Sequence, residues 1–194
     1  MLGFFGLVYQ NAITTATPNA VNMWSTSYAL INQANVTIAG VQGAAKAGII
    51  TAADASIYEG ELRFLRALAH HELVINFSKP YTDGKGANLG VPYRDFAINT
   101  TEGIAQSKTQ DRGTVTDDYT KILADLDFAE NNLPASRIIK NAAYASVTRA
   151  TKGLLSPSNS AFACTKQIGQ RRLRRALSLS RVRLRSPVRL AATC

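Results

Sequence analysis

Apolar side chains recur at helical spacing in three stretches of the chain. The first stripe has spacings of four, three, four and three residues and consists of Trp24, Tyr28, Ile31, Asn35 and Ile38. Side chains at this spacing share one face of an α-helix. Pro18 suits the first turn of this helix, and Gly40 or Gly43 is expected to end it. Asn35 is the polar member of the stripe, and the pattern favours a hydrogen-bonded core amide over a ligand contact.

The second stretch predicts a helix from Thr51 to about Phe77. Thr51 resembles an N-cap, and Asp54 supplies an acidic first turn. Two neighbouring apolar rows make the predicted buried face wide; they are Tyr58, Leu62, Leu65 and Ala69, and Ile57, Phe64, Leu68 and Ile75. A helix with this pattern needs neighbours on two sides. Glu59 and Arg63 are expected on the remaining polar strip, as an i, i+4 pair worth a few tenths of a kcal/mol.

The third stretch, Thr114 to Leu133, has the most regular helical period in the sequence. Its apolar positions are Val115, Tyr119, Ile122, Leu126, Ala129 and Leu133. Thr114 or Thr116 is expected to cap the helix, and Pro134 to stop it. A further helix is expected to begin near Ala142. The pattern as a whole predicts an all-α protein.

The 36 residues from Ser78 to Gly113 show no helical period and contain several glycines and prolines. Loops of this length in compact domains are usually functional or disordered. Three aromatic residues, Tyr81, Tyr93 and Phe96, make this loop the best candidate for a ligand-binding site. The alternative, which is the more common role of loop aromatics, is that they anchor the loop to its own core.

The sequence contains no recognisable catalytic or metal-binding motif. His70 and His71 are adjacent, so their side chains point about 100° apart on a helix and do not suit joint chelation of a metal. Histidines at the edge of the core are the favoured interpretation. The glycines at 84, 86 and 90 match no nucleotide-binding spacing and indicate turns. We therefore expect no metal site, no cofactor and no enzymatic activity.

Positive charge is confined to the end of the chain. The formal net charge is +9, yet residues 1–153 carry 13 basic and 13 acidic side chains and are neutral. Residues 154–194 carry nine basic side chains and no acidic one, together with both cysteines, Cys164 and Cys194. The sequence thus divides into a helical region, 1–153, and a basic tail, 154–194, that is expected to be poorly ordered.

Several motifs occur together in the order typical of one family. Residues 24–35, with Trp24, Tyr28, Ile31 and Asn35, resemble the W-x3-Y-x2-I-x3-N helix of SusD/RagB proteins, and residues 61–67, ELRFLRA, resemble their E-x-R-F-L-R-A motif. The run from Tyr119 to Pro134 is similar to the next helix of the family. The resemblance covers about 130 residues. His70 and His71 depart from it, because the family usually has aromatic residues there.

The resemblance implies a lipid-anchored protein of the Bacteroidetes outer membrane with a tetratricopeptide-like helical fold. Such a protein would capture a glycan or another oligomeric nutrient and deliver it to a TonB-dependent SusC-like transporter. This chain would be an N-terminal fragment of the fold, and this copy a non-functional truncation. Neither a signal peptide nor a lipidation cysteine is visible before the first predicted helix.

The family pattern breaks after Gly153, where an Ala-rich helix ending in Asp-Trp is expected. Residues 154–170 can be back-translated so that a shifted frame reads AIALKLRVCLHKADWP, which restores that helix and its Asp-Trp. In this back-translation the amino acids fix the first two bases of nearly every codon, so that only the third bases are chosen. The sequence therefore predicts a frameshift after Gly153. The alternative is a selected Arg-rich tail that binds nucleic acid or an acidic surface, although no nucleic-acid partner is expected if the frameshift is correct.

Overall fold

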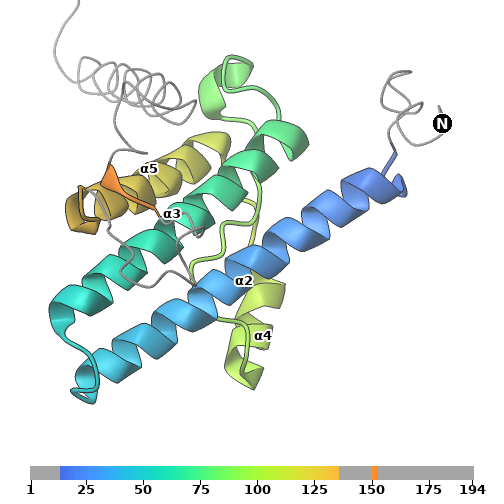
Figure 1. Ribbon diagram of the computed structural model, residues 1–194. Helices are drawn as coiled ribbons and strands as arrows, with labels where there is room; N and C mark the ends of the chain where they lie inside the picture. Colours follow the sequence, from blue (N-terminus) through green and yellow to red (C-terminus); the bar gives the residue numbers. More distant parts are fainter. Residues whose placement is uncertain (1–13, 136–149, 153–194) are drawn as a thin grey trace, which may run out of the picture.

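The computed structural model describes residues 14–135 and 150–152, and this part of the chain is helical (Figure 1). Its elements are α2 (Pro18–Lys46), α3 (Ala52–Phe77), the short 3-10 helix η1 (Gly84–Gly86), α4 (Thr101–Thr109) and α5 (Val115–Asn132). Extended pairing within these residues is limited to one isolated bridge between Leu89 and Thr114. The prediction of an all-α fold is confirmed. None of the helices described here is long and apolar enough to span a bilayer.

Helix α3 is the centre of the fold and packs against α2 on one side and α5 on the other. The predicted stripe of the third stretch is buried as expected, with Ile122, Leu126 and Leu133 at most 1% exposed. These side chains meet Ile31 of α2 and Leu73 of α3 in one hydrophobic cluster. The wide apolar face of α3 predicted neighbours on two sides, and α2 and α5 are those neighbours.

Helix α2 continues past the glycines that were expected to end it, so that part of the prediction is wrong. The helix reaches Lys46, and Gly48 adopts a left-handed φ of 72° just beyond it. The Gly48 and Ile49 amides donate to the carbonyls of Ala45 and Ala44, which is a Schellman motif. A glycine inside a helix costs only about 1 kcal/mol, so Gly40 and Gly43 do not stop the helix. It ends before Gly48, because the left-handed turn there favours glycine.

The face that α3 buries is more polar than its apolar rows predicted. Glu59, on the strip expected to face solvent, is 9% exposed, while Leu65 and Ile75 are 37% and 55% exposed. Arg63 Nε donates to Glu59 Oε1 over 2.7 Å, and its NH1 lies 3.5 Å from an Asp125 carboxylate oxygen on α5. The polar strip is therefore partly buried between two helices: Gln42 of α2 donates to Glu59, and Asp125 of α5 lies near Arg63.

Both helices that were given an N-cap from the sequence have one. Thr51 accepts a hydrogen bond from the Asp54 amide at the start of α3. At the start of α5, Thr114 and Asp117 form a reciprocal capping box, so Thr114 is the cap. The other candidate, Thr116, instead donates to the Gly86 carbonyl.

The connection between α3 and α5 contains a helix that the sequence pattern did not predict. Helix α4 has nine residues and is capped by Thr100, which accepts from the Gly103 amide. Its Ile104 is 47% exposed, so no apolar stripe marks the segment. A Cβ at position 103 would press on the Ala97 carbonyl, which explains the glycine at this close approach. The rest of the connection is irregular, as predicted.

Two predictions lie outside the described residues. The helix expected near Ala142 falls in the range 136–149, and the basic tail and its proposed frameshift fall in the range 153–194. The division into a helical region 1–153 and a tail 154–194 therefore stays a prediction.

Candidate functional site

A buried ion pair joins α3, α2, α5 and the long loop. Arg66 donates from Nε to Asp125 Oδ2 over 2.8 Å and from NH2 to Asp125 Oδ1 over 2.7 Å. Its third nitrogen donates to Asn35 Oδ1 over 2.7 Å and reaches the Asp95 carbonyl at 3.4 Å. Burial alone would lower the pKa of Arg66, but the hydrogen bond and charge of Asp125 raise it above its ordinary value. The guanidinium therefore stays charged and fixes three segments at one point.

Two aromatic rings stack beside this ion pair. The His70 and Tyr93 ring centroids lie 3.8 Å apart with planes at 16°, and the Tyr93 hydroxyl donates to Asp125 Oδ2 over 2.7 Å. His70 Nε2 accepts from the Arg94 amide, so its proton sits on Nδ1, next to the Arg66 carbonyl at 3.0 Å. Burial lowers the pKa of His70 to about 4. His70 is 0% exposed, so it is a core histidine as predicted, but it lies inside the core and not at its edge.

Polar side chains of α2 hold the backbone of the loop. Tyr28 donates its hydroxyl to the Pro92 carbonyl over 2.9 Å. Asn32 pairs with both backbone groups of Ile98, and Asn35 Nδ2 donates to the carbonyls of Arg94 and Phe96 at 3.1 and 2.9 Å. Residues 92–98 would otherwise leave backbone groups unpaired against α2. The expected role of Asn35 as a satisfied core amide is confirmed.

A second buried carboxylate fixes the beginning of this loop. Asp118 is 1% exposed, and its Oδ2 accepts from the Val91 amide over 2.7 Å. A Cβ at Gly90 would collide with the same carboxylate, so the backbone can approach it only at a glycine. Burial raises the pKa of Asp118 to about 7, against the lowering effect of the Val91 hydrogen bond. The glycines at 84 and 86 have φ of 66° and 81°, so they serve turns, as predicted.

The three aromatic residues predicted as ligand contacts differ in how much surface they offer. Tyr93 is 4% exposed and lies against His70. Tyr81 is half-buried and meets Tyr119 edge-on at 5.9 Å between centroids. Phe96 is also half-buried, and its carbonyl accepts from Asn35. The structure spreads these residues along the loop, with Tyr93 in its core. Ligand binding by Tyr81, Tyr93 and Phe96 stays a prediction.

The polar residues that hold the loop have a regular spacing in the sequence, but the helical period was counted on apolar residues only. Arg66 and His70 are spaced i, i+4 on α3, and Asp118 and Asp125 fall on the same face of α5 as the apolar stripe. Charged residues that share the register of a buried face indicate pairing across the core. The register therefore indicates that α5 carries buried carboxylates, but it does not show which of them pairs with Arg66.

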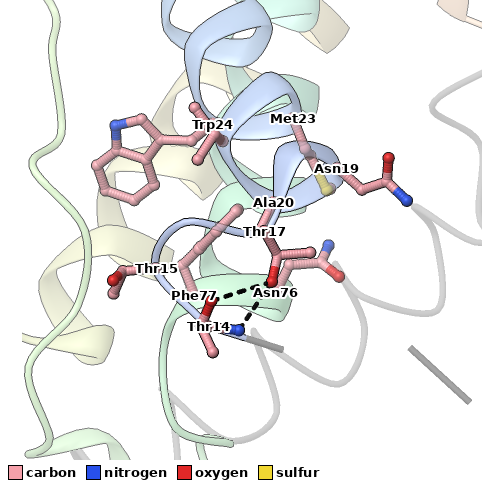
Figure 2. Close-up of a pocket in the computed structure, with 10 residues that line it drawn as sticks. Thr14, Thr15, Thr17, Asn19, Ala20, Met23, Trp24, Asn76 and Phe77 are labelled. Atoms are coloured by element: carbon pink, nitrogen blue, oxygen red, sulfur yellow. Dashed lines mark hydrogen bonds between the residues drawn. The ribbon is translucent and has the colours of Figure 1, made fainter. Parts of the chain in front are cut away.

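A cavity of about 620 Å³ lies where α2 begins and α3 ends (Figure 2). Its volume is in the range usual for small-molecule sites, about 300–1,000 Å³. The described residues that line it carry no formal charge; they are Thr14, Thr15, Thr17, Asn19, Ala20, Val21, Met23, Trp24, Asn76 and Phe77. The polar residues of this region are small and follow no motif, so the sequence predicts no functional role for it.

Two aromatic rings form one side of this cavity. Trp24 and Phe77 meet edge to face, with centroids 5.0 Å apart and planes at 79°, and Tyr28 adjoins Trp24 at 4.8 Å. Figure 2 shows Trp24 on one side of α2 and Asn19 on the other, with Asn76 beside Thr14 and Thr17. The Thr17 hydroxyl accepts from the Thr14 amide over 2.8 Å, which fixes the turn before α2. The cavity thus combines aromatic surface with amide and hydroxyl groups.

No group of three or more histidine, cysteine, aspartate or glutamate side chains is placed to hold a metal ion within residues 14–135 and 150–152. His71, the neighbour of His70, is 8% exposed, and burial lowers its pKa. A neutral, buried histidine next to a second one on a helix fits the core better than a metal site.

Solved structures share this fold. A SusD superfamily protein from Bacteroides vulgatus aligns with a TM-score of 0.55 and 22% identity over 82% of this chain and 32% of its own. A SusD-like protein from Bacteroides fragilis aligns with a TM-score of 0.52 and 25% identity over 75% of this chain and 24% of its own. A SusD-like carbohydrate binding protein from Bacteroides vulgatus aligns with a TM-score of 0.53 and 20% identity, over 69% and 25%.

The chain spans about a quarter to a third of the length of these solved relatives. None of the curated proteins matches it in sequence. A family described as SusD-like, "Starch-binding associating with outer membrane", matches residues 6–151, which is most of the chain. The helical fold and the order of its motifs agree with that match. The chain therefore belongs to the SusD-like family.

Proposed function

We propose that this chain is the N-terminal helical region of a protein that captures a glycan or another oligomeric nutrient at the outer membrane. The observation that carries the proposal is the match of residues 6–151 to a starch-binding, outer-membrane-associated family. The cavity whose described lining has aromatic and amide groups supports it, because sugars are bound by ring stacking and by hydrogen bonds to their hydroxyls. The protein acts by binding and not by catalysis.

The test is retention in a native gel that contains soluble starch, compared with a gel that lacks it. We expect the purified full chain to migrate more slowly in starch relative to a non-binding marker protein. Equal mobility in gels of starch, xylan, pectin and mannan would contradict glycan capture by this chain.

The partner in this proposal is a TonB-dependent SusC-like transporter in the same membrane. A protein that captures a nutrient at the outer surface needs a transporter to pass it across the membrane, and the family is described as associating with the outer membrane. A transporter gene of this class beside the gene for this chain, and its co-purification with the tagged protein, would support the pairing. Recovery of the protein without any outer-membrane component would count against it.

Ligand contact by the loop is a separate part of the proposal. Tyr81 and Phe96 are half-buried, whereas Tyr93 is 4% exposed. Phe96→Ala is expected to weaken starch retention if the loop touches the glycan. Ile104→Ala, on the exposed surface of α4, is the matched apolar control. Equal retention of both variants and the unaltered chain would remove Phe96 from the site.

The basic tail has its own proposal: residues 154–194 are read out of frame, so this copy is a truncation without a selected tail. Sequencing of the locus tests it, and an intact frame with the same Arg-rich end in related chains would contradict it. The alternative, nucleic-acid binding by the tail, predicts salt-dependent DNA retention that is lost when residues 154–194 are removed.

A further inference from the structure

The cavity between the start of α2 and the end of α3 has an aromatic wall that suits the apolar face of a sugar ring. Trp24 is half-buried, and its indole is held at fixed angles by Phe77 and Tyr28, with planes at 79° and 55°. A ring fixed by neighbours loses little side-chain entropy when a ligand stacks on it. The C–H groups on one face of a pyranose match such a surface.

A few hydrogen-bonding groups also line the cavity. The Asn76 amide donates one N–H to the Glu72 carbonyl over 2.8 Å, which orients the side chain. An amide has two N–H groups and a carbonyl, so the remaining N–H and the oxygen can serve a hydroxyl of a ligand. Thr14 and Thr15 add hydroxyl groups at the same rim. Amides and hydroxyls can both donate to and accept from sugar hydroxyls.

The lining also excludes one class of ligand. None of the ten described residues around the cavity is lysine, arginine, histidine, aspartate or glutamate. A carboxylate or sulfate that enters such a site loses hydration and finds no cation to replace it, which costs free energy. A neutral sugar has no such penalty.

We infer that this cavity is a subsite for a neutral sugar ring, with Trp24 as the stacking surface, and that it rejects uronic acids and sulfated sugars. The inference rests on the proposed function and deepens it by naming a site and a class of glycan.

Trp24 is the single tryptophan of the chain, so its fluorescence reports on this cavity directly. Titration of the full chain with maltoheptaose is expected to give a saturable change in tryptophan emission. Oligogalacturonate at the same concentrations is expected to give none. A saturable response to oligogalacturonate of equal affinity would overturn the inference of charge selectivity.

Substitutions locate the site without removing Trp24 from the core. Ala20→Phe places a ring in the cavity from α2, and Ala39→Phe, at an exposed position of the same helix, is its matched control. We expect Ala20→Phe to weaken maltoheptaose binding about tenfold or more, because it fills the space of the ligand, and Ala39→Phe to leave it unchanged. Asn76→Ala is expected to weaken it severalfold, relative to Asn131→Ala on the exposed surface of α5.

The outcomes separate this inference from the proposed function. Starch retention that persists in Ala20→Phe and Asn76→Ala, with no tryptophan response to maltoheptaose, would overturn the subsite and leave glycan capture intact. Failure of the unaltered chain to bind any glycan in gels or in fluorescence would overturn both. Loss of the tryptophan response in Ala20→Phe alone, with circular dichroism unchanged, would support the subsite.

Discussion

Arg66 and Asp125 face each other across the core, and Arg66 donates two hydrogen bonds of 2.8 and 2.7 Å to the Asp125 carboxylate. Their side chains are 7% and 5% exposed, so each charge depends on the other for solvation. Tyr93 adds a hydrogen bond to the carboxylate, and Asn35 accepts one from the guanidinium. Two helices and the loop are therefore joined to α3 through one ion pair.

Asp125→Asn is the first prediction from this arrangement. Removing one partner leaves the Arg66 charge buried without a counterion, which typically costs about 3–5 kcal/mol. The free energy of unfolding, measured by urea denaturation, is expected to fall by that amount. Asp111→Asn, at an exposed position before α5, serves as the control and is expected to change stability by less than about 0.5 kcal/mol. Equal effects of the two substitutions would contradict the role assigned to the ion pair.

His70→Gln tests the buried histidine through pH. The folded-state pKa of about 4 lies below the ordinary value of 6.5, so the unfolded chain binds the proton more strongly between these pH values. The contribution of neutral His70 to the free energy of unfolding is therefore fully present above pH 6.5. It falls as the pH drops toward 4, by on the order of 3 kcal/mol in total. The variant is expected to lose this part of the pH dependence. A difference between variant and unaltered chain that stays constant from pH 7 to pH 4 would contradict a neutral buried His70.

Asp118→Asn tests a pH dependence of stability that has the opposite sign to that of His70. The folded-state pKa of about 7 lies above the ordinary value of 3.8, so the folded chain holds the proton more strongly and loses stability as the pH rises from 4 to 7. The amide keeps an oxygen for the Val91 N–H and never ionises. The variant is therefore expected to gain on the unaltered chain as the pH rises, on the order of 3 kcal/mol by pH 7. Urea denaturation at pH 4, 5.5 and 7 measures this, and a gain that does not grow with pH would rule it out.

How far the sequence predicts this fold depends on whether a residue follows a helical period. The stripe from Val115 to Leu133 has that period and is buried as expected, and Thr51 and Thr114 cap their helices through local hydrogen bonds. Helix α4 has no apolar stripe, so the helical period did not predict it. Its N-cap and the close approach of Gly103 to the Ala97 carbonyl hold it in place instead.

The candidate site was predicted less well, because its geometry depends on contacts between distant segments. Asn35 lies 59 and 61 residues from the two carbonyls it bonds, and nothing in the local sequence states that separation. The loop aromatics Tyr81, Tyr93 and Phe96 could be identified as a group. Their different depths are set by His70 and Asp125, which belong to other elements. The cavity beside Trp24 is formed by two helix ends and has no motif of its own.

Asn35→Ala is the last prediction, and it separates the stability of the loop from that of the helices. The substitution removes the donor to the carbonyls of Arg94 and Phe96 and the acceptor for Arg66. Each buried group left without a partner costs about 1–3 kcal/mol, but Asp125 still neutralises Arg66. We therefore expect residues 92–98 to open more often while α3 and α5 keep their packing.

Amide hydrogen exchange measures this difference segment by segment. Exchange in residues 92–98 is expected to accelerate at least about tenfold in Asn35→Ala, which corresponds to a loss of about 1.4 kcal/mol in local stability. Gln33→Ala, on the exposed side of α2, is the control and should leave the loop unchanged. If α5 exchanged as fast as the loop in Asn35→Ala, the amide would support the whole core, and its assignment as a tether of the loop backbone would be wrong.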